Sequence, residues 1–121
     1  MTMLKLKRTV LGAIPDVLER VTVALQREGF GNLTRIDFHQ KLKELFGREV
    51  APVVILGAGA DDDAAAFSPW NVVLRQLCPG KISIEIVKPL TLKEFFREPG
   101  LTAVAAPADA LLARALASLA G

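Results

Sequence analysis

The chain contains a single thiol as its one obvious nucleophile. Cys78, the only cysteine, lies just before the turn-forming pair Pro79-Gly80. A cysteine reacts as a thiolate, which a neighbouring base or cation must stabilise. Lys81 or Arg75 would supply charge but no base, so we interpret Cys78 as an inert, partly exposed thiol. A divergent enzyme that uses Cys78 in redox or nucleophilic chemistry is the alternative.

The only histidine, His39, lies in the first turn of a predicted helix, close to Asp37. The partial positive charge of a helix N-terminus disfavours the imidazolium, so we expect a neutral side chain that packs at the helix end. A haem ligand or a general base is the alternative, but the sequence indicates no partner residue for it. One histidine excludes a His-pair metal site, and one cysteine excludes an internal disulfide and a multi-thiolate metal centre.

Two further motifs have both a chemical and a structural interpretation. The segment Val53–Gly59 resembles the start of a dinucleotide-binding turn, in which a strand is followed by Gly-x-Gly. Asp61-Asp62-Asp63 then stands where such a motif would present a helix N-terminus, and three negative charges would repel a pyrophosphate. Carboxylates suit Mg²⁺ or Ca²⁺, but adjacent residues cannot all face one ion. We therefore expect a strand end followed by a solvated acidic loop, with no metal and no cofactor.

Composition limits the classes of protein and of partner. The chain has 121 residues, of which 51% are apolar and 23% charged, and this predicts one domain over residues 1–121 with its own core. The net charge is +2, with no dense basic stripe and no Tyr, so we expect no nucleic-acid partner. The apolar run Ala51–Leu56 is far shorter than the roughly 20 residues of a membrane span, and no signal-peptide core is present. We expect a soluble cytoplasmic protein without a membrane partner.

Hydrophobic periodicity predicts the elements that position these residues. Period-two and apolar runs predict strands over residues 4–10, 31–36, 53–58, 71–77 and 82–86. Helical spacing predicts helices that begin at Pro15, Asp37, Thr91 and Pro107. The order β-α-β-α-β-β-β-α-α indicates a two-layer α+β domain, with helices packed on one face of a curved, mainly antiparallel sheet. The last two strands are expected to form a hairpin.

Two of the predicted helices have features that matter for packing. In the second helix, Asp37 and Gln40 form a capping box. Its buried face is expected to consist of Phe38, Leu42, Leu45 and Phe46. In the last helix, a buried leucine and alanine stripe faces the core, while Asp109 and Arg114 are the only charges. Such a poorly charged outer face is prone to association.

Several short motifs resemble one family in their order and spacing. They are Glu28-Gly29-Phe30, Asp37, Ile55-Leu56-Gly57-Ala58, Ser68-Pro69-Trp70-Asn71-Val72-Val73-Leu74, Gly80 and Lys88-Pro89-Leu90. Over about residues 4–98 the chain resembles the domain of unknown function DUF302. The resemblance implies a compact α+β fold of the TATA-binding-protein-like class, often dimeric, with no agreed biochemical role and no DNA binding.

The chain also departs from the pattern of that family. The family usually has Cys-Asn-Pro and a helix after Gly-Ala, whereas this chain has Gly59-Ala60 and then the acidic run. Trp70 stands where the family has a cysteine before asparagine. Both family positions that would suggest thiol chemistry are therefore missing.

These observations predict a non-enzymatic protein with no catalytic residue. We expect a homo-oligomer, most simply a homodimer, formed through the terminal helix or the edge of the hairpin. The alternative is a carrier or sensor with a small apolar ligand between helix and sheet. The candidate ligand-binding residues are Phe67, Trp70, Asn71, Phe95 and Phe96. Such aromatic residues more often fill the core.

Overall fold

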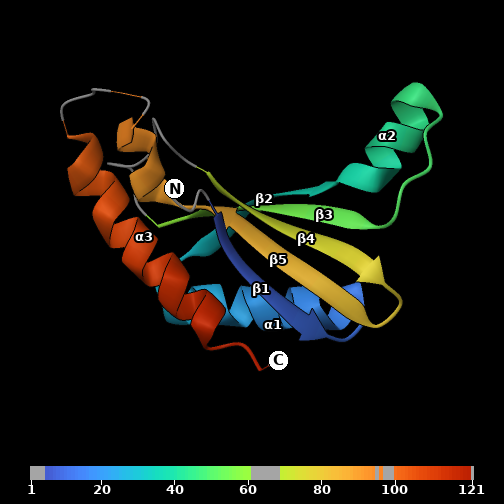
Figure 1. The fold of residues 1–121 in the computed structure, drawn as a ribbon, viewed down its shortest axis with the longest axis horizontal. Helices are drawn as coiled ribbons and strands as arrows, with labels where there is room; N and C mark the ends of the chain where they lie inside the picture. Colours follow the sequence, from blue (N-terminus) through green and yellow to red (C-terminus); the bar gives the residue numbers. More distant parts are fainter. Residues whose placement is uncertain (1–4, 61–68, 95, 97–99, 121) are drawn as a thin grey trace.

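The computed structural model describes residues 5–60, 69–94, 96 and 100–120, and these residues form the predicted α+β fold (Figure 1). The order of elements is β1 (Lys5–Leu11), α1 (Ile14–Arg27), β2 (Gly31–Asp37), α2 (Phe38–Phe46), β3 (Val53–Gly59), β4 (Trp70–Cys78), β5 (Lys81–Val87), a 3-10 helix (Pro89–Glu94) and α3 (Leu101–Ala117). The five strands form one antiparallel sheet in the order β1-β5-β4-β3-β2.

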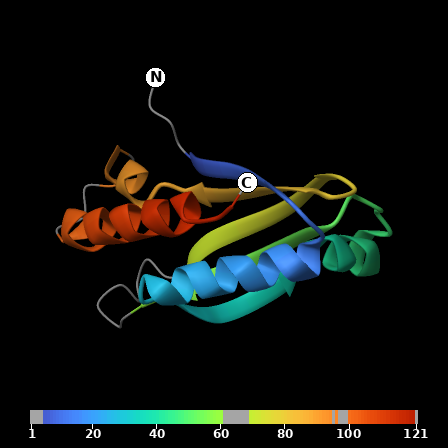
Figure 2. The same cartoon turned by 90° about the horizontal axis from the view of Figure 1, so that it is seen from below.

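The helices α1 and α3 pack on one face of this sheet, as Figure 2 shows. Alternate strand residues point to that face, because successive side chains of a strand point to opposite sides. Together with the helices they form the core cluster: Val10, Val17, Val21, Ala24, Leu25, Phe30, Val54, Leu56, Ala58, Trp70, Val72, Leu74, Ile82, Ile84, Ile86, Ala108, Leu112, Ala115, Leu116 and Leu119. The two-layer arrangement predicted from hydrophobic periodicity is confirmed.

Helix α1 begins and ends as its sequence indicates. Pro15 lies in the first turn, where its missing N–H removes no helical hydrogen bond. Gly29 follows the helix with φ +88°, a conformation that glycine adopts at no steric cost. The amide N–H of Gly29 donates to the Gln26 carbonyl oxygen (3.0 Å), which ties off the last turn.

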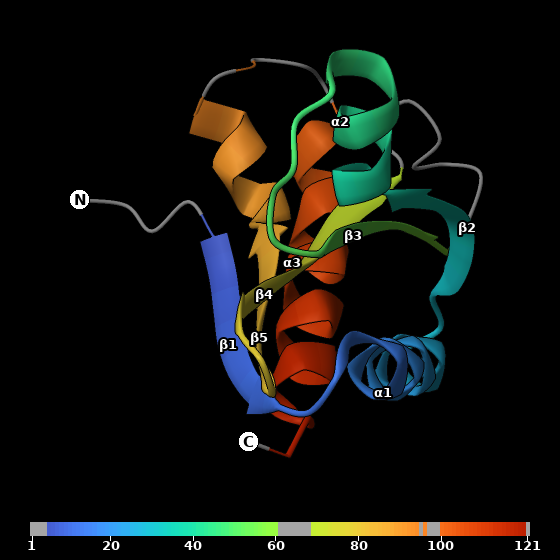
Figure 3. The same cartoon turned by 90° about the vertical axis from the view of Figure 1, so that its right-hand side faces the viewer.

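Helix α2 forms where predicted, but its predicted environment is wrong. None of its residues is buried, although its apolar residues share one side. Figure 1 shows α2 standing apart from α1 and α3, at one end of the sheet, and Figure 3 shows it away from α1. The predicted capping box is also wrong, because the side chain of Asp37 makes no hydrogen bond to the helix and is bound by Arg35 instead.

Helix α3 begins at Leu101, six residues before the predicted start at Pro107. The added turns contain Ala103, Ala105 and Ala106, which favour a helix, and bury Leu101 and Ala105. Pro107 lies exposed on the outer side of the helix. Burial of apolar residues before it outweighs the hydrogen bond that proline cannot make.

The short helix before α3 also differs from its prediction. It is a 3-10 helix that begins at Pro89, two residues before the predicted start at Thr91. The Thr91 amide N–H donates to the Lys88 carbonyl oxygen (2.9 Å). Within the described parts of the chain, no helix has both the length and the hydropathy that a membrane span requires.

Candidate functional site

The predicted thiol site consists of Cys78 alone in the described residues. Cys78 ends β4, is exposed, and lies opposite Lys81 in the β4–β5 hairpin. No hydrogen bond joins it to a described base. The same part of the chain holds no group of three or more His, Cys, Asp or Glu side chains that would ligate a metal.

The structure separates the predicted ligand-binding residues that it describes. Trp70 is buried on the helix-covered face, opposite Ala58 of β3. Asn71, the next residue of the strand, points to the opposite face and is exposed. Phe96 is 60% exposed. Phe67 and Phe95 lie outside the described residues, so the aromatic pocket stays a prediction.

One cavity between the helices and the sheet is about 10 Å³ in volume and is lined by apolar side chains of α1, β4, β5, α3 and Leu119. A cavity of this size holds at most one water molecule.

The Gly-x-Gly motif has a structural role in β3. Gly57 and Gly59 lie within the strand, with no strand-to-helix turn at this point. A Cβ atom at Gly57 would overlap the Thr34 side chain of β2 and the ring of Pro69, and one at Gly59 would overlap Leu33. These glycines therefore leave room for the side chains of Thr34, Leu33 and Pro69 to lie over β3. The acidic run Asp61-Asp62-Asp63 lies outside the described residues.

His39 anchors α2 to the start of β3. Its Nδ1 lies 3.0 Å from the amide nitrogen of Val53 and 2.9 Å from the carbonyl oxygen of the same residue. When the proton is on Nε2, the Val53 N–H donates to Nδ1; in the other tautomer, Nδ1–H donates to the carbonyl. The imidazole thus links the first turn of α2 to the start of β3.

A polar groove of about 390 Å³ adjoins His39, between the start of α1 and the ends of β2 and β4. Its chemistry-bearing groups are His39, Asp37 and Arg35, with Gln76 nearby. Asp37 Oδ1 accepts hydrogen bonds from Arg35 Nε (3.2 Å) and Nη2 (3.0 Å), so these two charges neutralise each other. The groove offers hydrogen bonds to a polar molecule, but no net charge.

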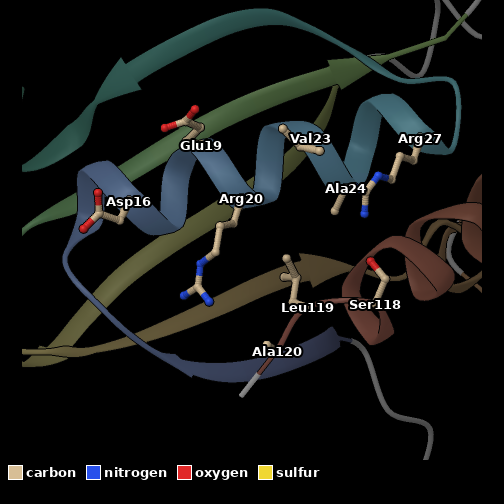
Figure 4. A pocket seen from close by; sticks show the side chains of 9 residues that line it. All are labelled: Asp16, Glu19, Arg20, Val23, Ala24, Arg27, Ser118, Leu119 and Ala120. Carbon is tan, nitrogen blue, oxygen red and sulfur yellow. The ribbon is translucent and has the colours of Figure 1, made fainter.

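A larger groove of about 460 Å³ runs between α1 and the segment after α3 (Figure 4). Arg20 and Arg27 extend from α1 towards Ser118–Ala120, and Arg20 Nη2 donates to the Leu11 carbonyl oxygen (2.8 Å). Asp16 and Glu19 also line it, so its two positive charges are balanced by two negative ones. Because apolar surface and both signs of charge are mixed, the groove favours no single class of ligand.

The most unusual surface is the one we call the β2–α2 surface, residues 31–50. None of these residues is buried, and only Asp37, His39 and Leu42 are even partly covered. Its large exposed apolar residues are Leu33, Ile36, Phe38, Leu45, Phe46 and Val50. An exposed apolar group of this extent on a small domain is typical of an interaction surface.

The charges of the β2–α2 surface are paired within it. Lys41 Nζ lies 3.4 Å from Glu44 Oε2, and Lys43 Nζ lies 3.2 Å from Glu49 Oε1. With the Arg35–Asp37 pair, they leave Arg48 as the one unbalanced charge of residues 31–50. The surface is therefore apolar and nearly neutral.

Sequence reasoning identified the apolar side of α2 but not its exposure. It instead placed the contact on the terminal helix or on the hairpin edge. The hairpin β4–β5 has no free edge, because β1 and β3 flank it in the sheet. Helix α3 buries Leu101, Leu112 and Leu116 and partly buries Leu111, and none of its residues is among the large exposed apolar residues.

Comparison with known proteins agrees with the fold. The family profile described as "Domain of unknown function DUF302" matches residues 6–119. A crystal structure of an uncharacterized conserved DUF302 protein from Bacillus stearothermophilus is similar, with a TM-score of 0.82 and 26% sequence identity. The similarity covers 96% of this chain and 98% of that chain. No curated protein matches. The chain belongs to the DUF302 family.

Proposed function

We propose that this domain is a non-enzymatic module that self-associates, with a second copy of the same chain docked on the β2–α2 surface. The observation that carries the proposal is that α2 has an apolar side and buries none of its residues. An amphipathic helix gains most of its stability from packing that side against something. A second copy would supply that packing.

The free edge of β2 supports a second copy as the occupant. In the described sheet, β2 pairs with β3 on one side only, so its other edge presents unpaired backbone N–H and C=O groups. A second β2 presents the same groups in reverse order across a two-fold axis. Two identical edges therefore satisfy each other without any other protein.

The size and charge of the surface also fit a second copy. The twenty exposed or partly covered residues 31–50 match the lower limit of the roughly 20–30 residues that each partner contributes to a stable interface. Because the charges are paired internally, two copies do not repel each other. A strongly charged partner would find no complementary charge here.

The experiment compares two exposed leucines in the full chain by size-exclusion chromatography with light scattering. Leu45 on α2 is 69% exposed and Leu11 at the end of β1 is 65% exposed. At tens of micromolar, we expect the wild type and Leu11→Glu to have twice the 13.0 kDa mass of one chain. We expect Leu45→Glu to have the mass of one chain, because burying a carboxylate in an apolar contact weakens association at least about tenfold.

A monomeric wild type at this concentration overturns the proposal. If the dimer persists in Leu45→Glu, or if Leu11→Glu disrupts it equally, the β2–α2 surface is not the site of self-association. A carrier of a small apolar ligand is the alternative function, and the cavity of about 10 Å³ between helices and sheet gives it no support.

A further inference from the structure

A groove between β1 and α3 has an unusual set of charges. Residues 5–8 of β1 form one wall, and Ala113, Leu116 and Ala117 of α3 form the other, with Lys88 at one end. We call it the β1–α3 groove. Its volume is about 290 Å³, close to the lower limit of small-molecule sites in proteins. It lies at the opposite edge of the sheet from the β2–α2 surface.

The lining of this groove carries positive charge only. Lys5, Lys7, Arg8 and Lys88 are among the lining residues and no carboxylate is. Alternation along β1 places Leu6 and Arg8 on the side of α3 and the side chains of Lys5 and Lys7 on the other face of the sheet, so Arg8 and Lys88 supply the charge of the groove. Lys5 is paired with Glu85 of β5 (3.1 Å). Lys7 lies opposite Glu85 in the strand register and its charge also acts on that carboxylate, whereas Arg8 and Lys88 have no ion pair with a described carboxylate. The whole chain, in contrast, has 15 basic and 13 acidic residues, so the groove concentrates one sign of charge.

Arg8 provides a second, independent observation. It is on the helix-covered side of β1, and its Nη2 donates to the Leu119 carbonyl oxygen. Its Nε is buried and has no acceptor among the described residues. A buried donor on a charged group is costly to leave unpaired, and buried polar groups in native proteins nearly always have a partner. Because Nε is closed off from solvent and Nη2 is bound to Leu119, an anion in the groove would be attracted by the charge of the guanidinium.

The remaining lining is apolar. Leu6 and Leu116 lie next to the cations, and Ala113 and Ala117 have small side chains that leave the groove open. The site therefore combines an anion-binding part with an apolar part. A bare anion would leave the leucines without a contact, and a neutral apolar molecule would leave the cations without one.

We propose that the β1–α3 groove binds a small amphiphilic anion, whose carboxylate or phosphate group contacts Arg8 and Lys88 and whose short apolar body lies against Leu6 and Leu116. This site is separate from the proposed self-association surface. It holds the ligand on the outside of the domain and needs no opening of the core.

The test is a titration of the ¹⁵N-labelled chain with four probes, followed by the amide resonances of residues 5–8 and 113–117. The probes are hexyl phosphate, hexanoate, 1-hexanol and inorganic phosphate. We expect hexyl phosphate and hexanoate to shift these resonances with saturation. We expect 1-hexanol and inorganic phosphate to bind at least tenfold more weakly, because each satisfies only one part of the groove.

Lys81, the first residue of β5, and Lys88, the residue after its end, provide matched variants. Lys88→Gln removes a groove cation, whereas Lys81→Gln removes an exposed cation at the other end of β5. We expect Lys88→Gln to weaken hexyl phosphate binding about two- to fivefold, the range for a partly exposed charge pair. We expect Lys81→Gln to leave it unchanged and Leu45→Glu, which blocks self-association, to leave it unchanged as well.

Several results would overturn the proposal. No shift at residues 5–8 and 113–117 with either amphiphilic anion removes the site. If 1-hexanol binds as tightly as the amphiphilic anions, the cations have no role in binding. If inorganic phosphate binds as tightly, the apolar part of the groove has none. Equal weakening by Lys88→Gln and Lys81→Gln shows attraction to the net charge of the protein and no defined groove.

Discussion

Helices α1 and α2 have the same kind of sequence but different surroundings. Both carry apolar residues on one side, and both end at a glycine with positive φ, Gly29 and Gly47. Helix α1 buries Val17, Val21, Ala24 and Leu25 against the sheet and α3, whereas α2 buries nothing. Hydrophobic periodicity thus shows that a helix has an apolar side, but it does not show whether the same chain covers that side.

The connections of the two helices explain the difference. Two residues separate α1 from β1 and three separate it from β2, its other neighbour in the chain, and the helix lies across the sheet. Helix α2 follows β2 directly and leads to β3, which is the neighbour of β2 in the sheet. It therefore lies at the end of its two flanking strands, and its main contacts are with them. Any contact that α2 makes with another described element is weaker than these two.

The largest expected effect compares one leucine from each region. Leu112 of α3 is fully buried, and Leu45 of α2 is 69% exposed. We expect Leu112→Ala to lower the free energy of unfolding by about 2–5 kcal/mol, because it leaves a cavity in the core. We expect Leu45→Ala to lower it by less than about 0.5 kcal/mol, as for other surface substitutions.

The measurement is urea unfolding at low micromolar concentration, where an associated form contributes little. The slope of the free energy against urea should be the same for both variants and the wild type. A loss at Leu45→Ala as large as that at Leu112→Ala would show that the apolar side of α2 is covered within one chain. The contrast between the two regions, and with it the proposed surface, would then be wrong.

The next effect tests how firmly β2, an exposed edge strand, is attached to the sheet. Gly57 faces the side chains of Thr34 and Pro69, whereas Gly59 faces Leu33. We expect Gly57→Ala to lower the free energy of unfolding by about 1–3 kcal/mol, because a rigid proline ring cannot move away easily. Gly59→Ala should lower the free energy of unfolding by less, since the end of the Leu33 side chain can rotate.

Thermal unfolding of the two variants at equal concentration checks this order. A larger loss at Gly59→Ala would show that Leu33 is fixed in place, and a Leu33 that is held by its own chain is less available to a partner. Equal and negligible losses would show that β2 can move away from β3. The packing of Thr34 and Leu33 over the two glycines would then not stabilise the fold.

Most of the fold could be predicted because its signals are local. Alternation in Ile82, Ile84 and Ile86 predicts a strand with one buried face, and Pro79-Gly80 predicts the hairpin turn. The starts predicted at Pro107 and Thr91 are wrong because contacts made by earlier residues begin both helices. Leu101 and Ala105 are buried before Pro107, and the N–H of Leu90, before Thr91, donates to Asp109 Oδ2 (3.2 Å).

The candidate sites could be predicted less well because they depend on which residues, distant in the sequence, become neighbours in the folded chain. Arg8 and Lys88 are far apart in the sequence and meet only because β1 pairs with β5 and α3 lies beside β1. Trp70 and Asn71 are adjacent in the sequence and point to opposite faces of the sheet. The exposure of α2 follows from strand order, which periodicity does not specify.

The smallest expected effect compares ion pairs from the two regions. Burial by itself raises the pKa of Glu85, but the hydrogen bond from Lys5 and the charges of Lys5, Arg75 and Lys7 outweigh it, so the pKa lies below its ordinary value. Glu85 is 14% exposed, whereas Glu49, paired with Lys43 on the β2–α2 surface, is 77% exposed. The covered pair should therefore stabilise the fold more than the exposed one.

A carboxyl group with a lowered pKa in the folded state stabilises the fold above its unfolded pKa, and this stabilisation is lost as the pH falls through the folded pKa. We expect Glu85→Gln to lower the free energy of unfolding by up to about 1 kcal/mol at pH 7 and Glu49→Gln to have little effect. Urea unfolding between pH 7 and pH 3 should show the Glu85→Gln difference shrinking as the acid limit is approached. A difference that stays constant with pH would mean that the loss comes from packing of the side chain, and the charge pairs of the two regions would then be equivalent.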